Sequence, residues 1–305
     1  MWDDKTHSLL WVDIDGRRLH CLHTPSGAQR DWPLPEEPGC LALVHDAATA
    51  DPASGSTPPA EFPAAVILAL RSGFHRFDLA RASLSRLTGP LFDIARYRFN
   101  DGTVDPRGRF WAGSLNEAKD GASAGLHRLE RGSAGAVTGA GAAASPWRDW
   151  GVQTSNGLAF SPDGLILYHS DTPAHVVYAY DFDVASGAIT HRRRWWQAPS
   201  DRGAGDYGGR PDGATVDADG CYWTAQYEGG RVLQISPIGE ILREIKVPAR
   251  CPTMVTFGGS DLGTLYITSA GGAGSAEELR TWPLSGHVFA VPVEARGLPA
   301  RRYVE

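Results

Sequence analysis

Short apolar segments with the pattern apolar-x-x-apolar recur along the chain at a nearly constant interval. Six copies are separated by 55, 52, 51, 55 and 56 residues, and they begin at Leu19, Phe74, Leu126, Val177, Val232 and Val288. An interval of about 40–50 residues, filled with strands and turns, is typical of a β-propeller with four strands in each blade. The pattern therefore predicts an all-β chain, a six-bladed β-propeller with four-stranded antiparallel blades around a central channel.

A second series of positions supports the same register. The turns "DPRG", "SPDG" and "DADG" end at Gly108, Gly164 and Gly220, which are spaced by 56 and 56 residues. Each turn is followed by an aromatic segment, "RFWAGS", "LILYHS" or "CYWTAQ". Glycine at the end of such a turn supplies the positive φ that a hairpin requires. We expect three consecutive blades to share one turn geometry.

The opening stretch "MWDDKTHSLLWVDIDG" has the same shape, a polar turn followed by an apolar strand. We therefore interpret it as part of the first blade, with the chain entering that blade partway through. Residues 1–305 are expected to form a single propeller domain. The Pro/Ala/Ser-rich residues 45–63 and the low-complexity residues 131–145 do not fit the strand pattern, and we expect both to be surface loops.

Composition narrows the class of partner. The 305 residues carry a formal net charge of −6, so no basic field indicates nucleic acid. No run of about 18 apolar residues predicts a membrane span, and no charged-then-apolar leader opens the sequence. The four cysteines form no CxxC pair. We interpret them as reduced, buried thiols of a cytoplasmic protein that is a monomer or a weak homo-oligomer.

Candidate metal-binding residues lie eight residues before each of the three turn glycines. These positions hold Asn100, Asn156 and Asp212, in the contexts "FNDGTVD", "SNGLAFS" and "PDGATVD". Equivalent positions in a propeller are related by rotation about its axis, so the three side chains are expected to converge at the mouth of the channel. Amide and carboxylate oxygens suit a hard divalent cation such as Ca²⁺ or Mg²⁺. The alternative is that Asn-Gly and Asp-Gly simply form turns.

These residues carry a resemblance to a known family. The segments "RYRFNDGTVDPRGRFWAGSL", "SNGLAFSPDG" and "PDGATVDADGCYWTAQYEGGRV" resemble the regucalcin/gluconolactonase family of six-bladed propellers, and the likeness runs from Trp2 to about Val291. The resemblance implies hydrolysis of a lactone at a single divalent metal ion in the channel.

The family's site residues carry over onto matching positions of this chain. The resemblance implies Asn156 and Asp212 as metal ligands, and Arg98 and Asn100 as substrate-binding residues. An acidic residue shortly after the "AG(S/T)" strand also contacts substrate in the family, and Glu117 is the nearest match here.

The family also has a "GExPxW" motif whose Glu is a third metal ligand. Its Trp aligns with Trp2, so that Glu would fall before residue 1. On this alignment we expect the 305-residue chain to lack one metal ligand and the strand that completes its last blade. We therefore expect the 305-residue chain to bind divalent metal weakly and to show low lactonase activity.

The function implied is divalent-metal-dependent hydrolysis of a sugar lactone, of the gluconolactone or arabinolactone type, to the aldonic acid. The cation (Ca²⁺, Zn²⁺ or Mn²⁺) polarises the carbonyl, and Asp212 takes a proton from the attacking water. Two alternatives remain. One is an inactive propeller that only binds a metal ion or ligand, and the other is a metal-dependent esterase or organophosphate hydrolase on the same scaffold.

Overall fold

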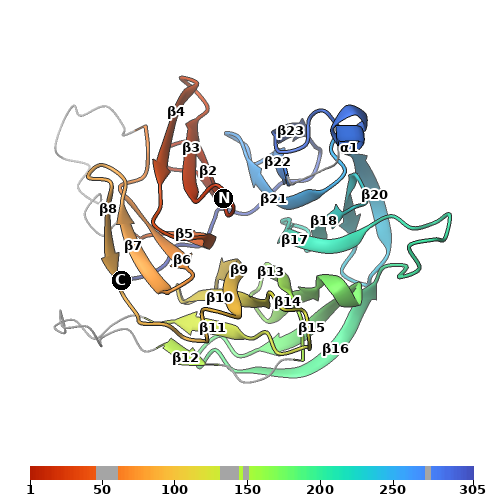
Figure 1. The fold of residues 1–305 in the computed structure, drawn as a ribbon, viewed down its shortest axis with the longest axis horizontal. Coiled ribbons are helices and arrows are strands. Elements are labelled where there is room, and N and C mark those ends of the chain that lie inside the picture. Colours follow the sequence, from red (N-terminus) through yellow and green to blue (C-terminus); the bar gives the residue numbers. More distant parts are fainter. Residues whose placement is uncertain (46–60, 131–143, 147–150, 272–275) are drawn as a thin grey trace. The chain divides into compact units, whose positions relative to one another are not determined.

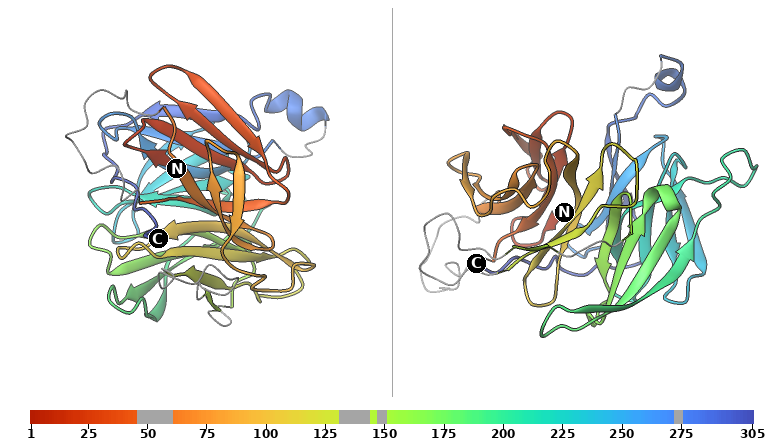
Figure 2. Two further views of the ribbon diagram at one scale, coloured as in Figure 1. Left: turned by 90° about the vertical axis from the view of Figure 1, so that its left-hand side faces the viewer. Right: turned by 60° about the horizontal axis from the view of Figure 1, so that its bottom comes forward.

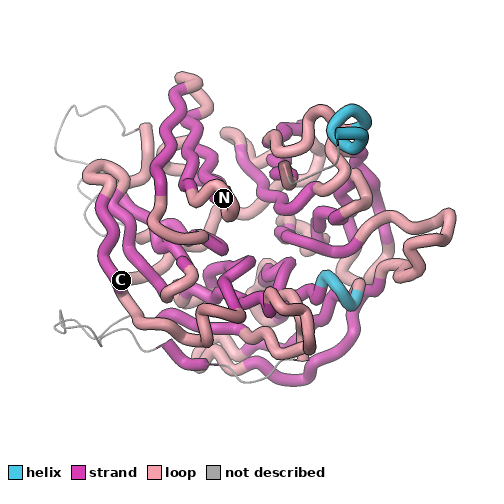
Figure 3. The backbone as a smooth tube through the Cα atoms, viewed as in Figure 1, coloured by secondary structure: helices cyan, strands magenta, loops and turns pink. Residues whose placement is uncertain are grey.

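The computed structural model describes residues 1–45, 61–130, 144–146, 151–271 and 276–305. Nearly all regular structure in these residues is β-strand (Figure 3), and the described residues contain two short helical segments. They are the 3-10 helix η2 (Thr172–Ala174) and the helix α1 (Ala276–Thr281). The predicted loops at 45–63 and 131–145 fall largely on residues 46–60 and 131–143, which lie outside the described residues.

The strands form six small antiparallel sheets, five of four strands and one of three among the described residues. In each sheet the strands follow one another in chain order, as in an up-and-down meander (Figure 1). This confirms the predicted fold class, an all-β six-bladed β-propeller. The sheets fall into two compact units, which are described separately below.

Unit 1 contains three sheets and comprises the described residues of Met1–Ala118, Gly125–Trp150 and Pro299–Glu305. The strands of its three sheets are β1 (Trp2–Asp3), β2 (Ser8–Asp13), β3 (Arg18–His23) and β4 (Ala28–Pro33); β5 (Pro38–Leu43), β6 (Ala65–Leu70), β7 (Gly73–Asp78) and β8 (Ser83–Arg86); and β9 (Tyr97–Val104), β10 (Phe110–Asn116), β11 (Leu126–Leu129) and β12 (Ala144–Pro146).

Unit 2 comprises Lys119–Ala124 and the described residues of Gly151–Leu298. The strands of its three sheets are β13 (Ser155–Phe160), β14 (Ile166–Asp171), β15 (Val176–Phe182) and β16 (Ile189–Gln197); β17 (Arg210–Val216), β18 (Tyr222–Tyr227), β19 (Arg231–Ile235) and β20 (Ile241–Lys246); and β21 (Pro252–Gly258), β22 (Thr264–Ser269) and β23 (Val288–Pro292).

In two sheets burial falls from the first strands to the last, and the sequence explains why. The continuous apolar runs "PGCLAL" of β5 and "AVILAL" of β6 are buried at every position, whereas "SLSR" of β8 is mostly exposed. The same gradient runs from β13, buried throughout, to β16, which exposes five consecutive side chains. A strand buried on both faces reads as a continuous apolar run, and an edge strand tolerates charge.

The three turn glycines adopt the conformation expected from the sequence. Gly108, Gly164 and Gly220 have φ values of 79°, 75° and 85°. In two of these turns the preceding Asp also accepts a hydrogen bond from the indole of the next strand. Trp111 Nε1 donates to Asp105 at 2.9 Å, and Trp223 Nε1 donates to Asp217 at 2.8 Å. The sequence repeat is therefore accompanied by the same Asp–Trp hydrogen bond in these two turns.

The C-terminal segment lies beside the β5–β8 sheet within unit 1 (Figure 2). Tyr303 forms a parallel bridge with Val44, and Glu305 forms an ion pair with Arg76 on β7 at 2.7 Å. All four cysteines are buried free thiols. Among the described residues, no helix is both long and apolar enough to cross a membrane.

Candidate functional site

The first strands of three consecutive sheets carry a β-bulge at the positions singled out by the sequence. The partner register slips at Asn100–Asp101 in β9, at Gly157–Leu158 in β13 and at Asp212–Gly213 in β17. In each case two residues of the first strand face one residue of the second. A bulge bends the strand and re-aims a side chain, and bulges are common next to active sites.

The alternative that these Asn-Gly and Asp-Gly pairs form turns is wrong. Asn100, Asn156 and Asp212 all lie inside strands, in β9, β13 and β17. Asn156 is buried, and Asp212 is half-buried. A polar side chain on an otherwise buried first strand needs a partner or a function.

In unit 2, Asn156 and Asp212 come from neighbouring first strands that approach closely. A side chain at Gly157 would lie 2.9 Å from the carbonyl oxygen of Asp212, and it would also overlap the hydroxyl of Tyr222. That hydroxyl donates a hydrogen bond of 2.8 Å to the carbonyl of Gly157. Only glycine fits here, and its φ of 57° is also one that other residues adopt reluctantly.

Hydrogen bonds link the two strands through Thr172. The side-chain amide of Asn156 donates to the Thr172 hydroxyl at 2.8 Å, and that hydroxyl donates to the carbonyl of Pro211 at 2.8 Å. Ser170 Oγ donates to the carbonyl of Asp212 at 3.2 Å. These contacts fix the plane of the Asn156 amide, so that its oxygen is directed away from Thr172.

The chemistry of these two residues fits a hard divalent cation. Asn156 offers an amide oxygen and Asp212 a carboxylate, which are ligands of Ca²⁺ and of Mn²⁺ rather than of soft metals. Among the described residues there is no group of three or more His, Cys, Asp and Glu side chains placed to hold a metal ion. A site on this pair would therefore draw its remaining ligands from amide, hydroxyl or backbone oxygens and from water.

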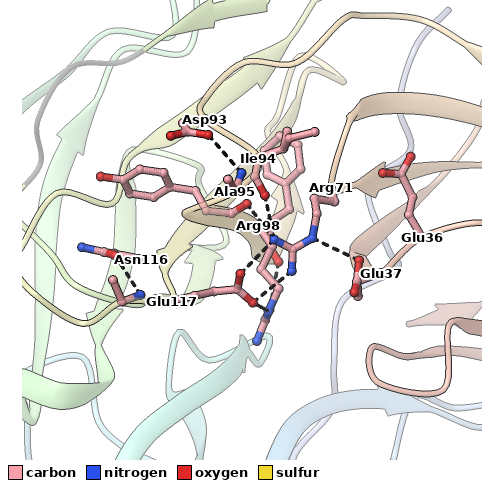
Figure 4. Close-up of polar contacts among 12 residues, drawn as sticks. Glu36, Glu37, Arg71, Asp93, Ile94, Ala95, Arg98, Asn116 and Glu117 are labelled. Atoms are coloured by element: carbon pink, nitrogen blue, oxygen red, sulfur yellow. Dashed lines mark hydrogen bonds and ion pairs between the residues drawn. The ribbon is translucent and has the colours of Figure 1, made fainter.

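In unit 1, Arg98 joins the other predicted residues. Its Nη1 donates to Asn100 Oδ1 at 2.9 Å and to the carbonyl of Phe99 at 3.0 Å. Its Nε lies 3.6 Å from Glu117 Oε1. The structure therefore brings together Arg98, Asn100 and Glu117. Figure 4 shows Arg98 beside Glu117.

Two residues of this group were missed by the sequence analysis. Arg71, in the turn between β6 and β7, donates to both carboxylate oxygens of Glu117, at 2.8 and 3.0 Å. It also donates to Glu37 at 3.1 Å (Figure 4). The segment "LRSG" carries no signal for this role, because the contact is made 46 residues along the chain. The two parallel bonds are the geometry in which arginine holds a carboxylate most firmly.

These contacts set the charge of the group. The hydrogen bonds from Arg71 lower the pKa of Glu117, against a smaller opposing effect of burial. Burial lowers the pKa of Arg98, and the neighbouring Glu117 carboxylate counteracts part of that effect. Glu117 is thus ionised at neutral pH and acts only as an acceptor, while Arg98 remains a donor. Such a pair can hold the hydroxyl groups of a polar ligand.

The two groups belong to different units, the one with Arg98, Asn100 and Glu117 to unit 1 and the one with Asn156 and Asp212 to unit 2. Each group is assembled within its own unit as described above. Convergence of all five side chains on one point stays a prediction.

Comparison with known proteins gives consistent matches over the whole chain. The family model described as "SMP-30/Gluconolactonase/LRE-like region" matches residues 1–271. A 6-deoxy-6-sulfogluconolactonase of Pseudomonas putida is 43% identical over 297 residues, which are 97% of this chain and 91% of the relative. The pentonolactonase XacC of Haloferax volcanii is 32% identical over 99% of this chain and 92% of its own length.

A solved structure shares the fold. The crystal structure of a calcium-binding protein, regucalcin from Agrobacterium tumefaciens, aligns with a TM-score of 0.84 at 23% sequence identity. The alignment covers 99% of this chain and 92% of the regucalcin chain.

Proposed function

The chain belongs to the SMP-30/gluconolactonase/LRE-like family, and on that premise we propose that it hydrolyses a sugar lactone to the corresponding aldonic acid. The observation that carries the proposal is the 43% identity, over 97% of the chain, to a relative named as a sulfogluconolactonase. A second relative, at 32% identity, is named as a pentonolactonase. The two names share one reaction, the opening of a sugar lactone by water.

Asp212 is the residue proposed to assist the attacking water. It is a half-buried carboxylate on the bulge of β17, and the carbonyl of its own backbone is held by Ser170 at 3.2 Å. The bond fixes the backbone at this position, and the Asp212 carboxylate can accept a proton from water as the oxygen attacks the lactone carbonyl. The ring C–O bond then breaks, and the released alkoxide takes up a proton to give the hydroxy acid.

Arg98, Asn100 and Glu117 are proposed to bind the sugar. Glu117, ionised and fixed by Arg71, accepts hydrogen bonds from hydroxyl groups. Arg98 donates from the same cluster, and its bond to Asn100 orients that amide. Holding the ring by several directional bonds places its carbonyl for attack and lowers the entropic barrier.

Asn156 and Asp212 are the residues that would hold a divalent cation, with the hydrogen bond from Asn156 to Thr172 fixing the amide. When bound, such a cation supplies Lewis acidity toward the carbonyl oxygen. The solved regucalcin structure is titled a calcium-binding protein, and we propose Ca²⁺, Mn²⁺ or Zn²⁺ for this chain in that order, because the donors are oxygens.

Hydrolysis of a lactone panel tests this function. D-Glucono-1,5-lactone, its 6-deoxy-6-sulfo derivative and L-arabino-1,4-lactone are incubated with protein, with each cation in turn and with chelator. p-Nitrophenyl acetate and a phosphotriester are included as competing ester classes. We expect acid release from at least one lactone, dependent on the cation. Release only from the phosphotriester, or from no substrate, contradicts the proposal.

The Asp212→Asn variant tests whether Asp212 acts as the general base, and Asp219→Asn is its matched control. Asp219 is an exposed residue of the "DADG" turn in the same sheet. Asp212→Asn is expected to lower kcat by about 10²-fold or more, in line with the loss of a general base. Asp219→Asn is expected to retain the rate of the unchanged protein.

A further inference from the structure

Arg71 joins two neighbouring sheets of unit 1, and a residue without an assigned role holds it in turn. Arg71 lies in the turn between β6 and β7, and its Nη1 and Nη2 donate to the two carboxylate oxygens of Glu117, at 2.8 and 3.0 Å. Its Nε donates to Glu37 Oε2 at 3.1 Å, and a dashed line marks this contact in Figure 4. Glu37 lies just before β5 and takes no part in the proposed chemistry.

Arg71 also holds the segment that leads into β9. Its Nη1 donates to the carbonyl of Ile94 at 2.9 Å and to that of Tyr97 at 3.4 Å. Tyr97 is followed directly by Arg98, one of the proposed sugar-binding residues. The orientation of one guanidinium plane therefore affects both Glu117 and the backbone beside Arg98. Rotation of that plane about the Cδ–Nε bond would break these contacts together.

The Glu37 carboxylate opposes that rotation. A guanidinium is planar and its donors form a rigid fork, so an acceptor placed on Nε–H fixes the plane that also contains the Nη donors. The side chains of Arg71 and Glu37 are only 20% and 22% exposed. A charge-assisted bond at this depth is screened less than one on the surface. Glu37 is thus placed to orient Arg71 without touching the sugar-binding residues itself.

The adjacent residue Glu36 provides a contrast. Its Oε1 accepts a hydrogen bond of 2.5 Å from Ser72 Oγ, and its Oε2 accepts one of 2.9 Å from the Ser72 backbone amide. Both glutamates are half-buried, and both bind the turn between β6 and β7. The backbone amide of Arg71 also donates to the backbone carbonyl of Glu37 at 3.2 Å, a bond that does not need the carboxylate. The turn is therefore attached to this segment by contacts that a change of the Glu37 side chain leaves in place.

We propose that Glu37 is a positioning residue for substrate binding, which acts through Arg71 on Glu117 and on the backbone beside Arg98. The inference rests on the proposed function, in which Arg98 and Glu117 bind the sugar. It deepens that function by naming a residue before the β5–β8 sheet that sets the affinity of a site built on the β9–β12 sheet.

The experiment separates this positioning role from a merely structural one. The variants are Glu37→Ala and Glu37→Gln, and the matched controls are Glu36→Ala and Glu36→Gln. Each is made in the unchanged protein and in an Arg71→Gln background. The kcat and KM values are measured with the lactones of the panel above. Calorimetry measures the dissociation constants of D-gluconate, 6-deoxy-6-sulfo-D-gluconate and L-arabinonate, which are their stable products, and thermal midpoints check the folding of each variant.

We expect Glu37→Ala to raise KM and the dissociation constant of the aldonate about fivefold with kcat within about twofold, because binding rather than chemistry is disturbed. Glu37→Gln keeps an oxygen acceptor for Nε and should raise both about two- to threefold. The Glu36 variants should leave KM unchanged. In the Arg71→Gln background, Glu37→Ala and Glu37→Gln should have no further effect, because the residue through which they act is absent.

Equal increases of KM in Glu36→Ala and Glu37→Ala overturn the proposal, because both residues then act only by holding the turn. An effect of Glu37→Ala that is the same with and without Arg71 overturns it as well. If Glu37→Ala does not fold, the smaller effect of Glu37→Gln, compared in the two backgrounds, decides the outcome.

Failure of the positioning role and failure of the proposed function give different results. Lactone hydrolysis with a KM that the Glu37 variants leave unchanged overturns the positioning role and leaves the function standing. Aldonate binding that Glu37→Ala weakens and Glu36→Ala does not, without hydrolysis of any lactone, supports the positioning role and overturns the function. A protein that neither binds an aldonate nor hydrolyses a lactone overturns both.

Discussion

The side-chain amide of Asn156 donates a 2.8 Å hydrogen bond to the hydroxyl of Thr172, which in turn donates to the carbonyl of Pro211. One hydroxyl therefore joins the bulged strand β13 to the strand that carries Asp212. Both strands present oxygen atoms that can bind a cation, and neither strand is positioned by the contacts of its own sheet alone. Positioning partners of this kind affect metal affinity nearly as strongly as the ligands do.

The first prediction concerns that hydroxyl. Thr172→Val keeps the shape of the side chain and removes both hydrogen bonds. We expect the affinity for Ca²⁺ or Mn²⁺ to fall about 10- to 100-fold, because the Asn156 amide is no longer fixed. The stability should fall by about 1–3 kcal/mol, because the buried amide and the Pro211 carbonyl each lose a partner. Metal titration and thermal unfolding measure the two effects.

Thr172→Ser is the matched control, since it retains the hydroxyl and loses only a methyl group. Its metal affinity should stay within about threefold of that of the unchanged protein. If Thr172→Ser and Thr172→Val lose metal affinity equally, the hydroxyl does not position Asn156, and the methyl group determines the effect.

The second prediction concerns Arg71 and the charge of Glu117. The folded-state pKa of Glu117 is lowered, chiefly by the Arg71 hydrogen bonds. The carboxylate is therefore ionised above that pKa, and its function is lost as pH falls through it. Arg71→Gln should raise the pKa of Glu117 toward its ordinary value, so that the acidic limb of kcat/KM for the lactone moves to higher pH. KM should rise about tenfold at neutral pH, because Glu117 also loses its fixed position.

A pH profile of kcat/KM between pH 4 and 7 measures the shift, and Arg81→Gln is the control. Arg81 is an exposed arginine of the same unit that pairs with Asp78 at 2.8 Å. An acidic limb that stays in place in Arg71→Gln, with the same KM, shows that Glu117 does not bind the substrate.

Sequence could predict the features that depend on local geometry. The turn glycines Gly108, Gly164 and Gly220 have the positive φ that their spacing indicated, and the strands that follow them were placed correctly. The spacing also predicted that Asn100, Asn156 and Asp212 occupy equivalent positions in three blades, and all three lie on the first strands of their sheets. The bulges did not, because one extra residue in a strand leaves the apolar pattern almost unchanged.

Contacts between blades cannot be predicted from a local sequence pattern. Arg71 comes from the β5–β8 sheet and Glu37 from the segment before it, and the tertiary structure alone brings Arg71 to both Glu37 and Glu117. Nothing in "LRSG" distinguishes Arg71 from the many surface arginines.

The third prediction concerns a repeated buried carboxylate. Asp217 is fully buried and accepts hydrogen bonds from Trp223 Nε1 at 2.8 Å, from the backbone of Cys221 at 2.8 Å and from that of Asp219 at 3.0 Å. Asp217→Ala leaves a buried indole N–H without a partner, so the free energy of unfolding should fall by about 2–4 kcal/mol. Asp219→Ala, in the exposed part of the same turn, should change it by less than about 0.5 kcal/mol. Urea denaturation of both variants tests this. Equal losses from both substitutions contradict the assignment of Asp217 as the residue that stabilises the turn.

The last prediction separates two costs at Gly157. Its φ is 57°, and an added Cβ would lie 2.7 Å from Ser170 Oγ and 2.9 Å from the carbonyl of Asp212. Gly27 has a similar φ of 72°, but a Cβ there meets nothing within 4 Å. Gly27→Ala therefore measures the backbone cost alone, about 1–2 kcal/mol. Gly157→Ala adds overpacking of about 1–3 kcal/mol and pushes β13 away from β17. We expect the larger loss of stability in Gly157→Ala, together with weaker metal binding that Gly27→Ala does not share. Equal unfolding free energies for the two variants, with unchanged metal binding, show that β13 and β17 do not need their close approach to hold the site.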